Sequence, residues 1–139
     1  MFKDIAINVE NNSVIQSFIK DCKLDIDAYI KLEEKDINAI VNTKGKISTI
    51  AGEGKGKDAV NESMQSLINN FADYQDIKTI LIRFYTHETF PAMEFQAPLN
   101  DLYQVFGREE EIIISILIDN TLSEDCVSAA SIIKQHVVV

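Results

Sequence analysis

Cysteine and proline are both scarce in this chain of 139 residues, which has two of each. Cys22 and Cys126 stand alone, without Cys-x-x-Cys spacing or companion histidines, so the sequence indicates neither a zinc site nor a disulfide framework. Few prolines, 46% hydrophobic residues and 25% charged residues are typical of a compact, ordered chain. At this length we expect one domain with a single core.

Long hydrophobic runs are also absent. No apolar stretch approaches the roughly 18 residues that a membrane-spanning helix needs. The N-terminal residues, with Lys3, Asp4 and Glu10 around a short apolar run, lack the pattern of a signal peptide. We therefore expect a cytoplasmic protein.

Positive charge is in the minority, with 13 Lys and Arg residues against 22 Asp and Glu residues and a net charge of −9. Such a balance repels phosphate backbones and anionic lipids, so we expect no nucleic-acid partner and no membrane partner. The exception is the segment 44–57, where four lysines stand against Glu53 alone. We interpret this lysine cluster as a solvated loop, because exposed lysines are most often only that.

The spacing of apolar residues predicts an ordered series of helices and strands. We expect strands at 4–9, 46–51, 77–85, 112–118 and 126–136, an extended segment with alternating buried residues at 24–32, helices at 14–22, 36–41, 59–71 and 99–106, and a loop at 86–98. Gly107 is expected to end the helix that precedes it. We find no internal repeat and no linker-like stretch.

From residue 46 the order is strand, helix, strand, helix, strand, strand. This order predicts an α+β fold, a two-layer sandwich in which helices cover one face of a four-stranded mixed sheet. The apolar strands 77–85 and 112–118 are expected at the centre of the sheet. The last strand is more polar, and we expect it to pair antiparallel with 112–118 and to form an edge to which another chain can add.

The stretch Ala-Gly-Glu-Gly-Lys-Gly-Lys-Asp that starts at Ala51 comes within two residues of a phosphate-binding loop. That loop needs a first glycine and a hydroxyl that binds Mg²⁺, and Ala51 and Asp58 take those two places here. The carboxylate puts negative charge where triphosphate and metal would meet. We therefore interpret Gly52, Gly54, Gly56 and Asp58 as a structural turn, in which the glycines permit close approach and positive φ and Asp58 caps the next helix.

Two stretches of the chain carry a resemblance to a family. The run from Asp36 to Val60 gives a helix, a glycine, a strand ending in Gly-x-Gly and a helix. The run 112–133 gives an apolar strand ending in Asp, a short polar turn and an alternating strand. Both resemble the C-terminal domain of FtsZ, the tubulin-like bacterial cell-division GTPase. The resemblance covers roughly residues 29–135, although Thr86 to Phe90 replaces a glycine pair of the family.

The resemblance has implications for activity and for domain organisation. In the family the nucleotide lies on an N-terminal domain, whereas here the segment before residue 24 is too short for one and no Gly-Gly-Gly-Thr-Gly loop is present. The resemblance therefore implies a chain that is not itself a GTPase and holds no cofactor. We expect residues 1–28 to form a β-α extension packed on an FtsZ C-terminal-like domain at 29–139.

The resemblance also implies an interaction loop. In the family an acidic loop of the form Asn-x-Asp-x-x-Asp enters the nucleotide site of the neighbouring subunit. Lys31, Glu33 and Asp36 match its asparagine and two aspartates by position, but Lys31 alters the charge and Glu33 is one methylene longer. Acting on a partner's nucleotide is one interpretation of these acids. The alternative, which we favour, is a solvated turn that caps a helix.

Two hypotheses of function remain open. The preferred one is a non-catalytic domain that acts by protein–protein contact, with FtsZ or a second copy of itself as the partner, the latter giving a homo-oligomer. The alternative is a small-molecule or enzymatic site on the same architecture, near Arg83 and His87 and the aromatic residues around them. We expect no metal at His87-Glu88, because no second histidine follows at the spacing of a zinc protease.

Overall fold

The computed structural model describes residues 13–23, 28–41, 47–71, 76–106 and 111–135. The elements are α2 (Ser13–Lys23), β1 (Ala28–Ile30), α3 (Glu34–Val41), β2 (Ile47–Lys55), α4 (Ala59–Phe71), β3 (Ile77–Thr86), the 3-10 helix η1 (Ala92–Phe95), α5 (Gln96–Phe106), β4 (Glu111–Ile118) and β5 (Cys126–Gln135). The predicted α+β fold is confirmed. The strand predicted at 4–9 and Gly107 lie outside the described residues.

The five strands form one mixed sheet in the order β1-β4-β3-β5-β2. β3 and β4 are parallel, and the other neighbours are antiparallel. The prediction that the last strand is an edge paired with β4 is wrong, because β5 lies between β3 and β2. Its polar side chains find partners inside the protein, which is why a more polar strand is tolerated there: Ser131 Oγ donates to the Leu81 carbonyl and Lys134 Nζ to the Ile40 carbonyl.

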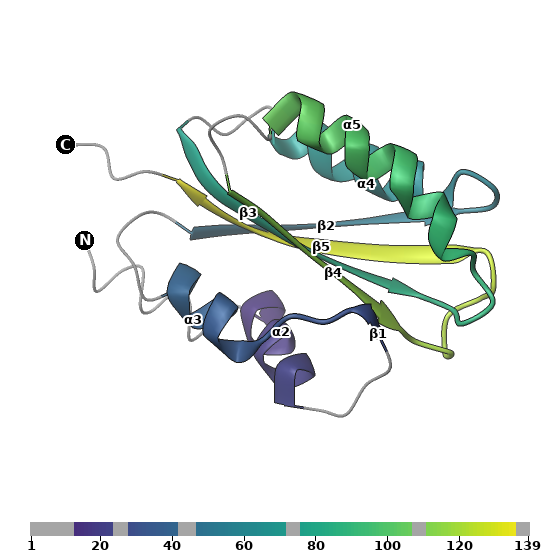
Figure 1. Ribbon diagram of the computed structural model, residues 1–139, viewed down its shortest axis with the longest axis horizontal. Coiled ribbons are helices and arrows are strands. Elements are labelled where there is room, and N and C mark those ends of the chain that lie inside the picture. The colour runs from purple at the N-terminus through teal and green to yellow at the C-terminus, as the bar shows by residue number, and fades with distance from the viewer. Residues whose placement is uncertain (1–12, 24–27, 42–46, 72–75, 107–110, 136–139) are drawn as a thin grey trace.

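Helices cover both faces of the sheet (Figure 1). α4 and α5 lie on one face, which we call the α4/α5 face, and α2 and α3 lie on the other, the α2/α3 face. The α4/α5 layer is the predicted one, whereas the second layer and the fifth strand, β1, extend the predicted two-layer, four-stranded arrangement. The domain division at residue 28 stays a prediction. The helices on either side of it, α2 and α3, contribute to the same core cluster.

Each face of the sheet has its own apolar core. In β3, Ile80, Ile82 and Phe84 belong to the cluster under α4 and α5, while Leu81 belongs to the cluster under α2 and α3. This alternation follows from the two-residue period of a strand. A strand covered on both faces reads as a continuous apolar run, which explains why β3 and β4 were recognisable in the sequence.

Three local boundaries differ from the predicted ones. β2 continues to Lys55 rather than ending at residue 51. η1 and the first turn of α5 replace part of the loop predicted at 86–98, and the first turn of η1 is closed by a hydrogen bond from Glu94 N to the Pro91 carbonyl. In the segment 24–32, Leu32 is buried as predicted, but Ile30 is 46% exposed because β1 is an edge strand.

Candidate functional site

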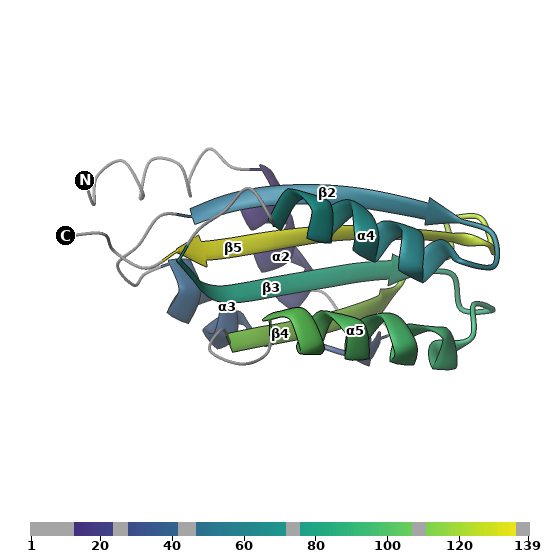
Figure 2. The same ribbon diagram turned by 90° about the horizontal axis from the view of Figure 1, so that it is seen from above.

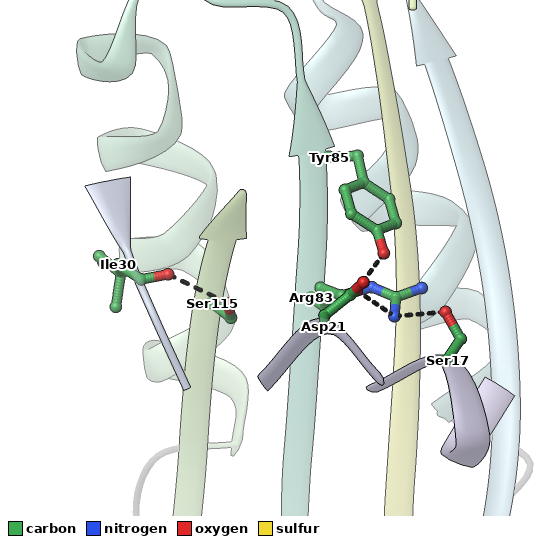
Figure 3. Close-up of polar contacts among 6 residues, drawn as sticks. All are labelled: Ser17, Asp21, Ile30, Arg83, Tyr85 and Ser115. Atoms are coloured by element: carbon green, nitrogen blue, oxygen red, sulfur yellow. Dashed lines mark hydrogen bonds and ion pairs between the residues drawn. The ribbon is translucent and has the colours of Figure 1, made fainter. Parts of the chain in front are cut away.

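The predicted interaction loop connects β1 to α3 on the α2/α3 face. Leu32 is buried at its centre, whereas Lys31 and Glu33 on either side of it are exposed. A buried leucine between two exposed charged residues fixes the loop to the core and presents their charges to solvent. At the edge of the sheet, Ser115 Oγ donates a 3.0 Å hydrogen bond to the Ile30 carbonyl, which joins β4 to β1 just before the loop (Figure 3).

The acidic residues of this loop are engaged in local contacts. Asp36 Oδ2 accepts a 3.2 Å hydrogen bond from the Glu33 backbone N–H, which is the contact of a capping residue in the first turn of a helix. The Glu33 carboxylate lies 3.1 Å from Lys35 Nζ, and this hydrogen bond, with the charge of Glu33 and then of Asp36, raises the pKa of Lys35. These contacts fit the alternative in which the loop caps a helix. They also leave the Glu33 side chain on the surface.

Only the last of the three glycines predicted as a turn lies in one. Gly52 and Gly54 are within β2, paired with Ala129 and Val127 of β5, so the predicted turn is shortened to Gly56 and its neighbours. Gly56 has a φ of 81°, which a glycine adopts without strain.

Gly54 is required for a different reason, the close approach of α4 to β2. A Cβ at Gly54 would lie 1.9 Å from the Ala59 carbonyl oxygen. At the start of α4, Glu62 Oε1 accepts a hydrogen bond from Lys55 N, and the Gly56 N–H donates to the Asp125 carbonyl. Glu62, rather than the carboxylate of Asp58, therefore makes the side-chain contact at this end of α4. The stretch joins a strand to a helix.

A buried polar cluster holds α2 to the sheet, and we call it the Arg83 cluster (Figure 3). Arg83 extends from β3 on the α2/α3 face, where its Nη1 donates to Ser17 Oγ at 2.8 Å and to Asp21 Oδ2 at 2.9 Å. The guanidinium carbon lies 4.3 Å from the ring centres of both Phe18 and Tyr85. Cation–π contact and an ion pair therefore act on the same guanidinium.

Tyr85 completes the Arg83 cluster through its hydroxyl, which donates to Asp21 Oδ2. Burial of the ring, and then this hydrogen bond, raise the pKa of Tyr85 to about 12. The side chains of Arg83 and Asp21 are 8% and 13% exposed. The cavity beside them is about 10 Å³, roughly the space of one water molecule, which leaves no room for a metabolite.

Arg83 and His87, which the sequence grouped into an alternative pocket, do not come together. Arg83 is buried in the middle of β3, while His87 follows the end of that strand, about 13 Å further along at the rise of an extended chain. His87 Nδ1 instead contacts Thr89 Oγ1 at 2.8 Å. The structure therefore gives no shared site for these two side chains.

The partners of Arg83 were missed by reasoning from the sequence. An arginine inside the apolar run Ile-Lys-Thr-Ile-Leu-Ile-Arg-Phe-Tyr is a signal that a counter-charge is needed, because a buried guanidinium requires one. Asp21 lies 62 positions away along the chain, so no spacing rule identifies it.

Metal-binding and membrane-spanning features are also absent from the parts of the chain that the structure describes. There, no group of His, Cys, Asp and Glu side chains is arranged to hold a metal ion, and Cys126 is a free thiol. None of the helices in these parts is both long and apolar enough to cross a membrane.

Comparison with solved structures shows which known fold this arrangement has. A structure described as an empty FtsZ dimer from M. jannaschii matches with a TM-score of 0.70 and 18% identity, over 94% of this chain and 39% of that chain. A mutant FtsZ from the same organism matches with a TM-score of 0.67 and 19% identity, over 94% and 40%. The fold is that of FtsZ. No family model and no curated protein matches the sequence.

The chain spans about two fifths of the FtsZ chains that it matches. This coverage is consistent with the C-terminal domain of FtsZ alone, and it confirms the resemblance predicted from the two stretches of sequence. At 18–19% identity the likeness shows the fold and leaves the roles of individual residues open.

Proposed function

We propose that this chain is a protein-interaction domain that binds a tubulin-like subunit through the loop from Lys31 to Asp36. The observation that carries the proposal is the form of this loop on an FtsZ fold: Leu32 anchors it in the core and Glu33 projects from it, with 66% of its side chain exposed. FtsZ is described as a dimer in one of the matching structures. A surface of the same fold is thus a reasonable place for a subunit of that kind to bind.

We further propose that binding occurs without activation of GTP hydrolysis. A carboxylate that orients or deprotonates water must be free to reach it. Asp36 is hydrogen-bonded to the Glu33 N–H and Glu33 is paired with Lys35, so both acids have local partners. Lys31 adds a positive charge where the family loop carries an asparagine. A chain of this kind would occupy the contact surface of a filament subunit and slow the turnover of GTP by the filament.

Co-sedimentation with FtsZ filaments assembled in GTP tests the proposal. The variant is Glu33→Gln/Asp36→Asn, which removes two charges while the amide introduced at the second position keeps an oxygen for the Glu33 N–H. The matched control is Glu53→Gln/Glu124→Gln, which removes two exposed charges from other elements. We expect the wild type and the control to sediment with filaments, the loop variant to bind roughly tenfold more weakly, and GTP turnover not to rise.

Two results would contradict the proposal: no sedimentation of the wild-type chain with filaments, or equal binding by the loop variant and its control. A rise in GTP turnover with the wild type would contradict only the second part, binding without activation. Sedimentation velocity of the chain alone addresses the other partner, a second copy. A species of twice the mass that the loop variant abolishes would assign the loop to self-association.

A further inference from the structure

A surface groove lies on the α4/α5 face, between the first turn of α4 and the segment formed by η1 and α5. The helices α4 and α5 begin at the same end of the sheet (Figure 2), so their first turns form opposite walls. The groove has a volume of about 340 Å³, which is within the range of ligand sites. It is on the opposite face of the sheet from α3 and the Lys31–Asp36 loop.

The apolar part of the groove consists of a buried base and an exposed side. Val60 and Pro98 line it and are buried in the protein. Met93 also lines it and is 82% exposed, the largest exposed fraction among the large apolar side chains of the described residues. A methionine is flexible and polarisable and adapts to different apolar partners, so an exposed one beside a cavity is suited to binding.

The charged part of the groove is predominantly acidic. Among the residues that the structure describes, Asp58, Glu94 and Asp101 line it together with a single cation, Lys57. Within the described parts of the chain, none of these three carboxylates has an ion-pair or side-chain hydrogen-bond partner. The local excess of negative charge adds to a chain with a net charge of −9. An occupant that brings positive charge is therefore favoured, both on approach and in the bound state.

We propose that this acidic groove docks a short basic peptide segment of another protein, with one large apolar side chain between lysines or arginines. The apolar side chain enters beside Met93 and above Val60 and Pro98, and the cations face Glu94 and Asp101. Phosphorylated or otherwise anionic ligands meet an excess of carboxylates. A second copy is a poorer occupant, because two chains of net charge −9 repel each other.

Titration with a labelled probe tests this proposal independently of the interaction loop. The probe is the fluorescein-labelled peptide Lys-Arg-Leu-Arg-Lys, compared with Lys-Arg-Gly-Arg-Lys and Glu-Asp-Leu-Asp-Glu. Fluorescence anisotropy measures affinity, and amide chemical shifts of the ¹⁵N-labelled chain locate the site. We expect the leucine peptide to bind at least fivefold more tightly than the glycine peptide. The acidic peptide is expected not to bind, and the largest shifts are expected at the first turn of α4 and in η1.

Matched variants separate the groove from the general charge of the chain. Glu94→Gln/Asp101→Asn should weaken binding of the leucine peptide at least fivefold, whereas Glu53→Gln/Glu124→Gln should leave it within twofold. Met93→Ser should weaken binding, whereas Val105→Ser, at a 60% exposed position of α5 that does not line the groove, should not. The loop variant Glu33→Gln/Asp36→Asn should bind the peptide normally.

Several outcomes would overturn the proposal. Equal losses in the groove variant and its charge control would show non-specific attraction to an acidic protein. Equal affinity for the leucine and glycine peptides would show that no apolar side chain of the peptide contributes to binding. Amide shifts confined to other elements would place the peptide elsewhere. Shifts in η1 and α4 that depend on protein concentration without peptide would assign the groove to a second copy.

Discussion

Two cations, Arg83 and Lys134, are buried on the α2/α3 face of the sheet, and each has a defined partner. Arg83 faces the carboxylate of Asp21, whereas Lys134 Nζ donates to the Ile40 carbonyl in the last turn of α3. The carbonyls of a last helical turn lack partners within the helix, so a cation there satisfies one of them and interacts favourably with the helix dipole. The two residues thus attach different helices to the same face.

The lowered pKa of Lys134 should make the free energy of unfolding depend on pH. Burial, and then the charge of Lys78, lower the pKa of Lys134 from 10.5 to about 8. Below about pH 8 both the folded and unfolded states bind the proton, and the folded state carries the full cost of the buried charge. Between about 8 and 10.5 the unfolded state binds more protons, so the free energy of unfolding gains a positive slope, at most about 1.4 kcal/mol per pH unit for one proton.

Urea denaturation of the wild type and of Lys134→Met at pH 8, 9 and 10 measures this slope. The difference in free energy of unfolding, wild type minus variant, is expected to rise with pH. The raised pKa of Tyr85 acts in the opposite direction, because its contribution is present below about pH 10 and is lost as pH rises through about 12. The measurements therefore stop at pH 10, before the contribution of Tyr85 begins to be lost. Parallel curves for the wild type and Lys134→Met would show that Lys134 does not cause the pH dependence. Lys78→Met should keep most of the positive slope, because burial is the larger cause of the lowered pKa of Lys134.

Among the elements, the two helices flanking the interaction loop are held in different ways. α3 packs Ile37 and Ile40 into the core of the α2/α3 face, and its first turn is closed by Asp36. α2 packs Ile15 and Phe18 into the same core. It also depends on the polar contacts of Asp21 with Arg83 and Tyr85. Loss of that carboxylate should therefore affect α2 more than α3.

We expect Asp21→Asn to lower the free energy of unfolding by about 3 kcal/mol, the usual cost of removing one partner from a buried ion pair. Amide hydrogen exchange should show the largest loss of protection in α2 and little change in β3 and β5. Lys20→Gln, at an exposed position of the same helix, is the matched control and should leave protection unchanged. Uniform loss across the sheet would mean that the Arg83 cluster supports the whole fold rather than α2.

The molecule as a whole presents two surfaces on opposite faces of one sheet. The interaction loop belongs to the α2/α3 layer and the acidic groove to the α4/α5 layer, so the two proposed contacts lie on separate faces of one domain. The two core clusters, one on each face, fix both layers to the strands β2, β3, β4 and β5. On these proposals, a partner bound at one surface should leave the other accessible.

The 139-residue chain should gain no stability from GTP. Around the Gly56 turn, the Gly56 N–H is bonded to the Asp125 carbonyl and the Asp58 carboxylate opposes a phosphate. Millimolar GTP with Mg²⁺ should leave the melting temperature unchanged in a thermal-shift assay. A ligand at a hundred times its dissociation constant would add about 2.7 kcal/mol, enough for a shift of several degrees. A shift of that size would show that a nucleotide site exists within these residues.

The candidate sites were predictable from the sequence to different degrees. The loop at Lys31, Glu33 and Asp36 was proposed from its match to the family, and its role in binding stays a prediction. The structure adds that Leu32 within it is buried. The pocket at Arg83 and His87 was proposed from proximity in sequence, and those side chains lie apart. The acidic groove was not anticipated, because Asp58, in the turn before α4, and Asp101, in α5, come together only when both helices pack on the sheet.

The sequence by itself determined the type and approximate position of most helices and strands and the α+β class. Apolar periodicity records which residues of one segment face a core, and that information is local. Only the tertiary structure decided that β5 lies inside the sheet, that a second helical layer covers the other face, and that Asp21 neutralises Arg83. These depend on which segments meet in space, and local periodicity does not specify the partner that covers a buried face.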